Sequence, residues 1–437
     1  MPPLEPLARR ERWFRSVLPN TRLCAVSWPL PASAAAPPPP PPRGALLFVH
    51  GYAHYCAPLY DWLAAVLAPR GIACFALEHV GHGKSEGVRA FIPSHEGLVD
   101  DLLRFAAAVR AAELPAGTPL FAYGESLGAG LCILAALRVP RAFAGLVLLA
   151  PMVGASEGME PAWPIVALGR AAALVAPTAA LAPVREILPL CFRDASLLPA
   201  ARADPNRYTG RMRLRTALEL KAAIALLAAT GPALAVPVFI AHGDGDQVTS
   251  HRASARLLEA CASRDKTLCT FEGAWHVLFA EPADTRARLL EEITAWLDQR
   301  CRPVPEVGGA AAGGGDGGGE VHFRRVSYAA SAAAFGTFVG EPGALTTVFS
   351  WASHAHLVTR QQPDGELAPA DGDGDGAAAA AATRPAGIVA LVPRLVALGA
   401  FAAGAVALSQ GLFAFGIVAG IVFGAAALVA RRSGAWR

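Results

Sequence analysis

"FAYGESLGAGLCILAAL", residues Phe121–Leu137, decides the fold of this chain. An apolar run that ends at Tyr123 predicts a buried strand, and the small and leucine-rich run that follows predicts a buried helix. Between them stands a G-x-S-x-G motif, with Gly124 and Gly128 two residues away from Ser126 on either side. In the order strand, G-x-S-x-G, helix, the serine occupies a sharp turn that holds its hydroxyl at the end of a sheet. The stretch therefore predicts a nucleophilic serine at a strand-to-helix corner.

The sequence on either side of this corner predicts an α/β fold. From Gly44 to about Arg300, short apolar runs alternate with segments of helical pattern. Strands that are apolar throughout and separated by helices are typical of a mostly parallel sheet with helices on both faces. The alternation is interrupted at about 152–232 by an Ala-, Leu- and Pro-rich segment, which predicts a helical insertion between two strands.

A proline run, "SAAAPPPPPPR" at 33–43, separates strand-like runs at 22–28 and 45–49. Consecutive prolines cannot join a helix or a sheet, so the run predicts a polyproline II spacer in a surface loop. Its position between two strand-like runs predicts a long hairpin connection.

A serine hydroxyl is a weak nucleophile that needs a base, and the base needs an orienting carboxylate. In a fold of this kind the chain order is Ser, then Asp or Glu, then His. "FIAHGDGDQVTS" follows a strand-like run and offers Asp244 and Asp246. Asp246 lies farther beyond the strand end and is the candidate acid, whereas Asp244 is the candidate for capping the turn. "FEGAWHVLF" follows the last strand-like run and offers His276 as the candidate base.

An oxyanion hole needs backbone N–H groups close to the serine. Leu127, directly after the serine, is the first candidate donor. The loop after the first apolar strand, "FVHGYAHY", offers Tyr52 as the second, although a tight turn is the other interpretation of "HGY". His50 and His242 stand next to glycines at strand ends, and we expect them to be structural.

Composition excludes several function classes for the 437-residue chain. A formal net charge of +3, without a basic patch interleaved with aromatic residues, gives no reason to expect a nucleic-acid partner. The sequence shows no zinc-type Cys/His cluster, and its eight scattered cysteines favour buried free thiols over a disulfide framework. The charged N-terminus lacks the apolar core of a secretory signal peptide, whereas an Arg-rich transit peptide stays open.

The C-terminal third predicts linkers and a membrane segment. Glycine-rich and low-complexity stretches make 304–385 a linker region, partly disordered by composition. Within 386–430, Gly411–Ala430 alone meets the roughly 20-residue requirement for spanning a bilayer. A single helix and a helical hairpin both fit this segment, and 431–437 is a basic tail.

Arginines flank the membrane segment on both sides, which favours a hairpin with both ends, and hence the preceding domain, on the cytoplasmic side. Three glycines in the segment recur every four residues and would lie along one helix face. Such a stripe permits close helix–helix contact, so self-association is a further expectation. The stripe consists of Gly416, Gly420 and Gly424.

Four blocks of the sequence together resemble the monoacylglycerol lipase and plant lysophospholipase-like group of the α/β-hydrolase fold. They are "VHGYAHY", "EHVGHGKSEG", "YGESLGAG" with "LLAPM", and "HGDGDQVT" with "TLCTFEGAWHVLFAEP". The resemblance implies an α/β-hydrolase domain over 1–303, in which the insertion at about 152–232 is a lipid-admitting lid. It implies the same roles for Ser126, Asp246 and His276, and matches the family's oxyanion positions to Tyr52 and Leu127. The family's second block usually begins with Asp-His, and this chain has Glu78 in place of the aspartate.

The resulting expectation is a membrane-anchored serine hydrolase. Its substrate would be a lipid ester, either a monoacylglycerol or a lysophospholipid, from which it releases a fatty acid without a metal or organic cofactor. Three alternatives stay open: acyl transfer to another alcohol, hydrolysis of small esters by the same triad, and a non-catalytic membrane scaffold. "HEGLVD" also places His95 and Asp100 in an H-x-x-x-x-D arrangement that occurs in glycerolipid acyltransferases.

Overall fold

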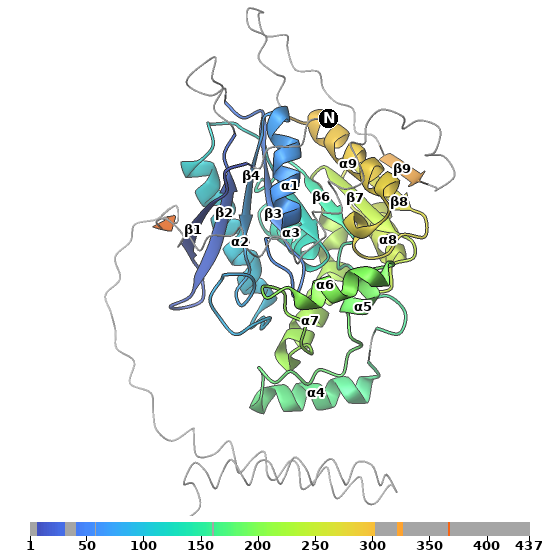
Figure 1. The fold of residues 1–437 in the computed structure, drawn as a ribbon. Helices are drawn as coiled ribbons and strands as arrows, with labels where there is room; N and C mark the ends of the chain where they lie inside the picture. The colour runs from blue at the N-terminus through green and yellow to red at the C-terminus, as the bar shows by residue number, and fades with distance from the viewer. Residues whose placement is uncertain are drawn as a thin grey trace, which may run out of the picture. The chain divides into compact units, whose positions relative to one another are not determined.

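The computed structural model shows a sheet of ten strands flanked by helices (Figure 1). All described residues belong to the first of two units into which the chain divides, Met1–Asp371 and Gly372–Arg437. The structure describes residues 7–30, 41–56, 58–159, 161–301, 321–326 and 366–367.

The sheet has the strand order β10-β1-β2-β4-β3-β5-β6-β7-β8-β9. β2 runs antiparallel to both of its neighbours, and every other neighbouring pair is parallel. Because β3 to β7 are covered on both faces, nearly all of their residues are buried, which explains their unbroken apolar runs. The strands are β1 (Arg10–Arg15), β2 (Arg22–Trp28), β3 (Gly44–Val49), β4 (Ile72–Leu77), β5 (Leu120–Glu125), β6 (Leu146–Leu149), β7 (Val238–Gly243), β8 (Lys266–Phe271), β9 (Val321–Val326) and β10 (Glu366–Leu367).

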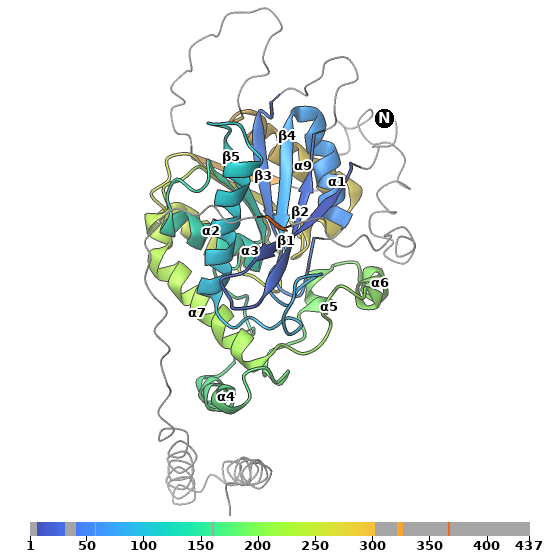
Figure 2. The ribbon, with the colours of Figure 1, turned by 90° about the vertical axis from the view of Figure 1, so that its left-hand side faces the viewer.

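Helices cover the two faces of the sheet and form separate cores. α1 (Pro58–Leu67) and α9 (Ala283–Asp298) pack on one face, and a core rich in aromatic residues lies beneath them. α2 (His95–Ala112) and α3 (Leu127–Arg138) pack on the other (Figure 2). α8 (His251–Ala260) contributes to the same core. Short 3-10 turns occur at Ala68–Arg70, Ala195–Leu197, Gly231–Ala233 and Leu278–Ala280.

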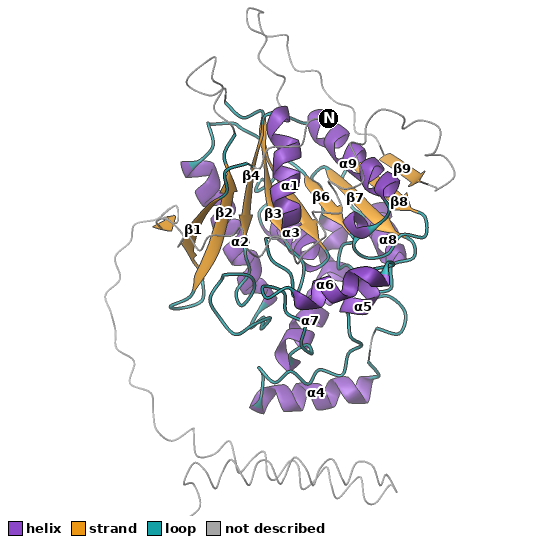
Figure 3. Cartoon of the chain, in the orientation of Figure 1, coloured by secondary structure: helices purple, strands orange, loops and turns teal. Residues whose placement is uncertain are grey.

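The insertion between β6 and β7 is helical, as the sequence predicts, and forms a lid at one end of the sheet (Figure 3). Its last helix packs on α2 and α3, whereas α4 has no buried residue. The lid lies beyond the carboxyl ends of the parallel strands, which is where ligands bind in open α/β sheets. Its helices are α4 (Trp163–Val175), α5 (Leu188–Cys191), α6 (Leu198–Ala203) and α7 (Leu214–Thr230).

The expected hairpin around the proline run is wrong. β2 and β3 are not neighbours, because β4 lies between them and pairs with both. The connection through α1 places β4 beside β3 in parallel, and β2 then pairs with the remaining edge of β4. The charged N-terminal segment also contains a strand that the sequence did not suggest, β1, which carries the fully buried Phe14.

The expected membrane segment (386–430), basic tail (431–437) and glycine stripe lie outside the described residues. Within the expected linker (304–385), Val321–Val326 forms β9 next to β8, and Arg324 Nη1 lies 3.0 Å from Glu292 Oε2 on α9. None of the described helices has the length and hydropathy needed to cross a membrane. All eight cysteines are buried free thiols.

Phe48 anchors the aromatic core beneath α1. Its ring stacks on Tyr60 at 4.6 Å between centroids and meets Tyr123 and Trp28 edge-on. Replacing Phe48 by Ala should lower the free energy of unfolding by about 3–5 kcal/mol, because the buried ring leaves a cavity. Chemical denaturation measures this, with Val88→Ala at an exposed position as the control. A loss as small as that of the control would show that this core is not as tightly packed as the structure indicates.

Candidate active site

Ser126 stands in a strained turn between β5 and α3. Its φ of 53° and ψ of −114° are rarely adopted by L-residues, and such strain persists only when the surroundings enforce it. Close backbone packing supplies that enforcement. A Cβ added at Gly128 would lie 2.0 Å from the carbonyl oxygen of Val49, and one at Gly124 would lie 2.5 Å from Cα of Ala129. The motif glycines therefore let the helix rest directly on two strands, which fixes the serine at their ends.

The loop after β3 approaches the same turn. A Cβ added at Gly51 would lie 3.4 Å from Cβ of Ser126, so the backbone of this loop passes beside the serine. Within the described part of the chain, the backbone N–H groups of Tyr52 and Leu127 have no hydrogen-bond acceptor. Two unengaged N–H groups next to a serine hydroxyl are the arrangement that an oxyanion hole requires.

Asp246 and His276 meet on the far side of the serine. His276 Nδ1 lies 2.7 Å from Asp246 Oδ2, and the Asp246 side chain is fully buried. Burial on its own raises the pKa of Asp246, but His276 and the hydrogen bonds from His242 and His276 outweigh it and hold that pKa well below its usual range. An ionised carboxylate accepts a hydrogen bond from Nδ1–H, which keeps the proton on Nδ1 and leaves Nε2 of His276 as the basic nitrogen.

The two candidate aspartates have different positions. Asp244 Oδ1 accepts a hydrogen bond from the backbone N–H of Gly273 at 2.6 Å, so it caps the neighbouring turn. His50, expected to be structural, lies under the loop after β3: its Nε2 accepts from the backbone N–H of His79 at 3.0 Å. His242 contacts the side chain of Asp246 directly, with Nε2 3.0 Å from Oδ2. Its position next to a glycine gave no sign of this contact.

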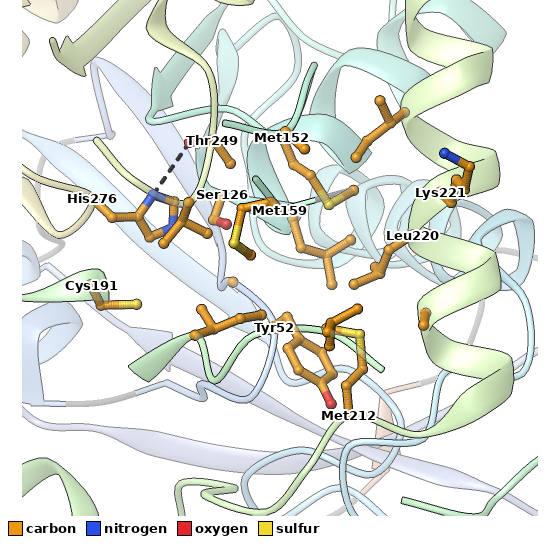
Figure 4. A pocket seen from close by; sticks show the side chains of 18 of the residues that line it. Tyr52, Ser126, Met152, Met159, Cys191, Met212, Leu220, Lys221, Thr249 and His276 are labelled. Atoms are coloured by element: carbon orange, nitrogen blue, oxygen red, sulfur yellow. Dashed lines mark hydrogen bonds between the residues drawn. The ribbon is translucent and has the colours of Figure 1, made fainter. Parts of the chain in front are cut away.

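Ser126 and His276 face one pocket between the sheet and the lid, with a volume of about 410 Å³ (Figure 4). Among the described residues, no hydrogen bond joins Ser126 Oγ to His276. Hydrogen bonds between a nucleophile and its base often tighten only when substrate binds. Thr249 Oγ1 lies 3.3 Å from His276 Nδ1. The remaining wall is mostly apolar and comes largely from the lid, including Met152, Met159, Ile165, Ile187, Met212 and Leu220.

Glu125 is a site residue that the sequence did not reveal, because the position before the serine is variable in the motif. Glu125 is one of the residues that line the pocket, and its Oε1 accepts a hydrogen bond from Tyr123 Oη at 2.7 Å. Burial raises the pKa of Glu125 to about 7, and the Tyr123 hydrogen bond and the nearby His276 only partly oppose this. A carboxyl group that titrates near neutral pH therefore adjoins the serine.

His95 and Asp100 do not act together. His95 Nδ1 lies 2.7 Å from Glu219 on α7, and Asp100 forms an ion pair with Arg138. Neither residue lines the pocket. The structure thus separates the two residues of the H-x-x-x-x-D arrangement.

Glu78, at the position where the family that the sequence resembles usually has aspartate, is fully buried beneath the loop after β3. Its carboxylate accepts hydrogen bonds from the backbone N–H groups of Cys56 and Lys84, at 3.1 and 2.5 Å. These contacts hold the loop, and neither of them involves Ser126, Asp246 or His276.

Comparisons with known proteins agree with this geometry. The Hydrolase_4 family model, described as "Serine aminopeptidase, S33", matches residues 40–283. Human monoglyceride lipase is 30% identical over 59% of this chain and 83% of its own length. Caffeoylshikimate esterase of Arabidopsis thaliana is 30% identical over 60% of this chain and 79% of its own length. The crystal structure of a soluble variant of Saccharomyces cerevisiae monoglyceride lipase has the same fold, with a TM-score of 0.57 at 20% identity, and covers 68% of this chain and 97% of that one.

The raised pKa of Glu125 predicts a pH-dependent cost in stability. Between the ordinary pKa of glutamate and about 7, the folded state holds a proton that the unfolded state has lost. The free energy of unfolding therefore falls as pH rises through that window. Glu125→Gln does not titrate, so its stability relative to wild type should increase from pH 5 to pH 8 in thermal unfolding. The exposed Glu259→Gln is the control, and a pH-independent difference for Glu125→Gln would contradict the raised pKa.

Proposed function

Because the chain belongs to the serine aminopeptidase S33 family of α/β hydrolases and is an ester hydrolase, we propose that it cleaves the ester bond of a monoacylglycerol. The observation that carries this proposal is the apolar pocket, which begins at Ser126 and runs beneath the lid. The names of the monoglyceride lipase relatives support it. A lysophospholipid shares the single acyl chain and is the nearest other substrate.

The geometry supports an acyl-enzyme mechanism. Ser126 Oγ attacks the ester carbonyl while Nε2 of His276 takes its proton, and Asp246 stabilises the imidazolium that forms. The N–H groups of Tyr52 and Leu127 bind the oxyanion. His276 then protonates the departing alcohol, and water, activated by the same histidine, releases the fatty acid and restores Ser126.

Pocket size and lining indicate how many acyl chains fit. A volume of about 410 Å³ lies at the lower end of the range for small-ligand pockets. An apolar wall of this extent suits one acyl chain, whereas a triacylglycerol would have to place two further chains outside it. The proposed substrate therefore carries a single chain and a small head group.

A substrate panel tests this assignment. The ratio kcat/KM should be about tenfold or more higher for monoacylglycerols than for triacylglycerols, because only one chain fits beneath the lid. The panel also includes lysophospholipids, soluble aryl esters and an added alcohol acceptor. A preference for aryl esters would remove the lipid assignment. A preference for lysophospholipids would change the head group, and transfer to the alcohol in place of hydrolysis would identify an acyltransferase.

We also propose that the enzyme works at a membrane. The lid exposes large apolar side chains on α4 and just after it, with Trp163 79% and Leu174 86% accessible, which is typical of a surface that meets lipid. The composition of 386–430 supports a membrane anchor with the hydrolase domain on the cytoplasmic side, and Gly416, Gly420 and Gly424 support helix self-association.

Protease added from the cytosolic side of intact membranes should then digest the hydrolase domain, because an anchor of this orientation leaves the domain exposed on that side. Full protection of the domain would reject this orientation.

Substitutions on α4 separate lid docking from the anchor. Replacing both Trp163 and Leu174 by Ser should lower the rate on vesicle-borne monoacylglycerol by about 30-fold or more, since each apolar side chain transferred from water to lipid contributes roughly 1–2 kcal/mol. The rate on a water-soluble ester should stay the same, because neither side chain lines the pocket. Ala167→Ser, exposed on the same helix, is the matched control. Equal losses on both substrates would contradict lid docking.

A further inference from the structure

His242 is held beside the proposed catalytic acid on both of its ring nitrogens. It stands near the end of β7 and its side chain has no solvent exposure. Nε2 lies 3.0 Å from Asp246 Oδ2, and Nδ1 lies 2.9 Å from the hydroxyl of Ser254 on α8. An ionised carboxylate only accepts hydrogen bonds, so Nε2 carries the proton and Nδ1 accepts from Ser254. The network therefore selects one tautomer of this histidine.

The carboxylate of Asp246 receives hydrogen bonds on both oxygens. The backbone N–H groups of Val248 and Thr249 donate to Oδ1 at 2.7 and 3.1 Å. Oδ2, the oxygen that faces His276, lies 2.7 Å from that base, 3.0 Å from His242 and 2.8 Å from Thr249 Oγ1. Backbone groups thus hold one oxygen, whereas side chains hold the oxygen that orients the base.

We propose that His242 is a positioning residue for the catalytic acid. It holds Oδ2 of Asp246 in the orientation in which that oxygen accepts a hydrogen bond from Nδ1–H of His276, and its own N–H group stabilises the carboxylate charge. The chain Ser254–His242–Asp246–His276 then sets the basicity of His276. This inference rests on the proposed function, because it needs His276 to act as the base.

A space-filling role does not account for this arrangement. An apolar side chain of similar volume would fill the same space beneath α8. It would leave the hydroxyl of Ser254 and one lone pair of Asp246 Oδ2 without their partners in a buried site, which is costly. A role in packing alone also gives no reason for a donor that shares one carboxylate oxygen with the proposed base.

Three other titratable side chains face this hydrogen-bonded chain. His251 on α8 packs edge-on against His242 at 5.6 Å and hydrogen-bonds Thr270. Cys191 comes from α5, where burial raises its pKa to about 12, so it stays neutral in an activity assay. Glu125 comes from β5, where burial raises its pKa to about 7, and it is present in the wild type and in the variants alike. Differences between their pH profiles therefore report on His242.

The test compares His242→Leu with His242→Gln in the full chain. Gln can donate from its amide to Asp246 Oδ2, whereas Leu cannot. A fluorophosphonate counts the reactive sites, so kcat/KM on a monoacylglycerol is expressed per titrated site from pH 5 to pH 9. His242→Leu should lose about 10- to 100-fold, as is usual for residues that orient a catalytic group. The midpoint pH of the acid limb of its kcat/KM profile should move upward. Without the hydrogen bond from His242, the charge of Asp246 stabilises protonated His276 more strongly.

His242→Gln should stay within about tenfold of wild type with its midpoint unchanged. Ser254→Ala removes only the hydrogen bond to His242 Nδ1 and should shift the acid-limb midpoint in the same direction as His242→Leu. It serves as the test if His242→Leu does not fold. His95→Gln breaks a similar buried histidine–carboxylate pair away from the site and should alter stability alone.

The inference would be overturned if the acid-limb midpoint were unchanged in both His242→Leu and Ser254→Ala and these variants lost only reactive sites, with kcat/KM per site unchanged. His242 would then have a structural role alone. If the fluorophosphonate does not titrate the wild type, the proposed function itself fails, which is a different result.

Discussion

The contact between the backbone of α3 and the strands beneath it is the constraint on which this structure depends. Gly128 lies against the carbonyl of Val49, and Gly124 lies against Ala129, so neither position has room for a side chain. This contact forces Ser126 into its strained conformation at the carboxyl end of β5. Because the neighbouring strands are parallel, their following loops reach the same edge and bring Tyr52 and His276 to the pocket of the serine, and Asp246 to His276.

The features that the sequence predicts depend on residues close together in the chain, whereas the features that it does not predict depend on residues far apart in the chain. The buried strands and the elbow were predictable, because apolar runs, glycines and chain order are local signals. The position of β4 between β2 and β3 was not, since pairing depends on how distant segments cross over. The environments of Glu125 and His242 were equally hidden, because what matters for each is a neighbour supplied by the folded sheet.

The apolar side chains of the lid have two different environments. One part of the lid lines the cavity above Ser126, and another part, on α4, faces solvent. Exposed side chains such as Leu174 are unfavourable in water and become favourable against lipid. On the proposed function, the same segment that receives the acyl chain also brings the enzyme to the surface in which that chain resides.

The central claim is that Ser126, His276 and Asp246 work as one nucleophilic unit. Labelling with a serine-directed fluorophosphonate, followed by mass spectrometry of the labelled peptide, tests it most directly. The account predicts a single adduct on Ser126 in the wild type, its loss in Ser126→Ala, and strongly slowed labelling in His276→Ala. The exposed Ser196→Ala should label like the wild type. A wild type that takes up no label, or an adduct on another serine, would contradict the account.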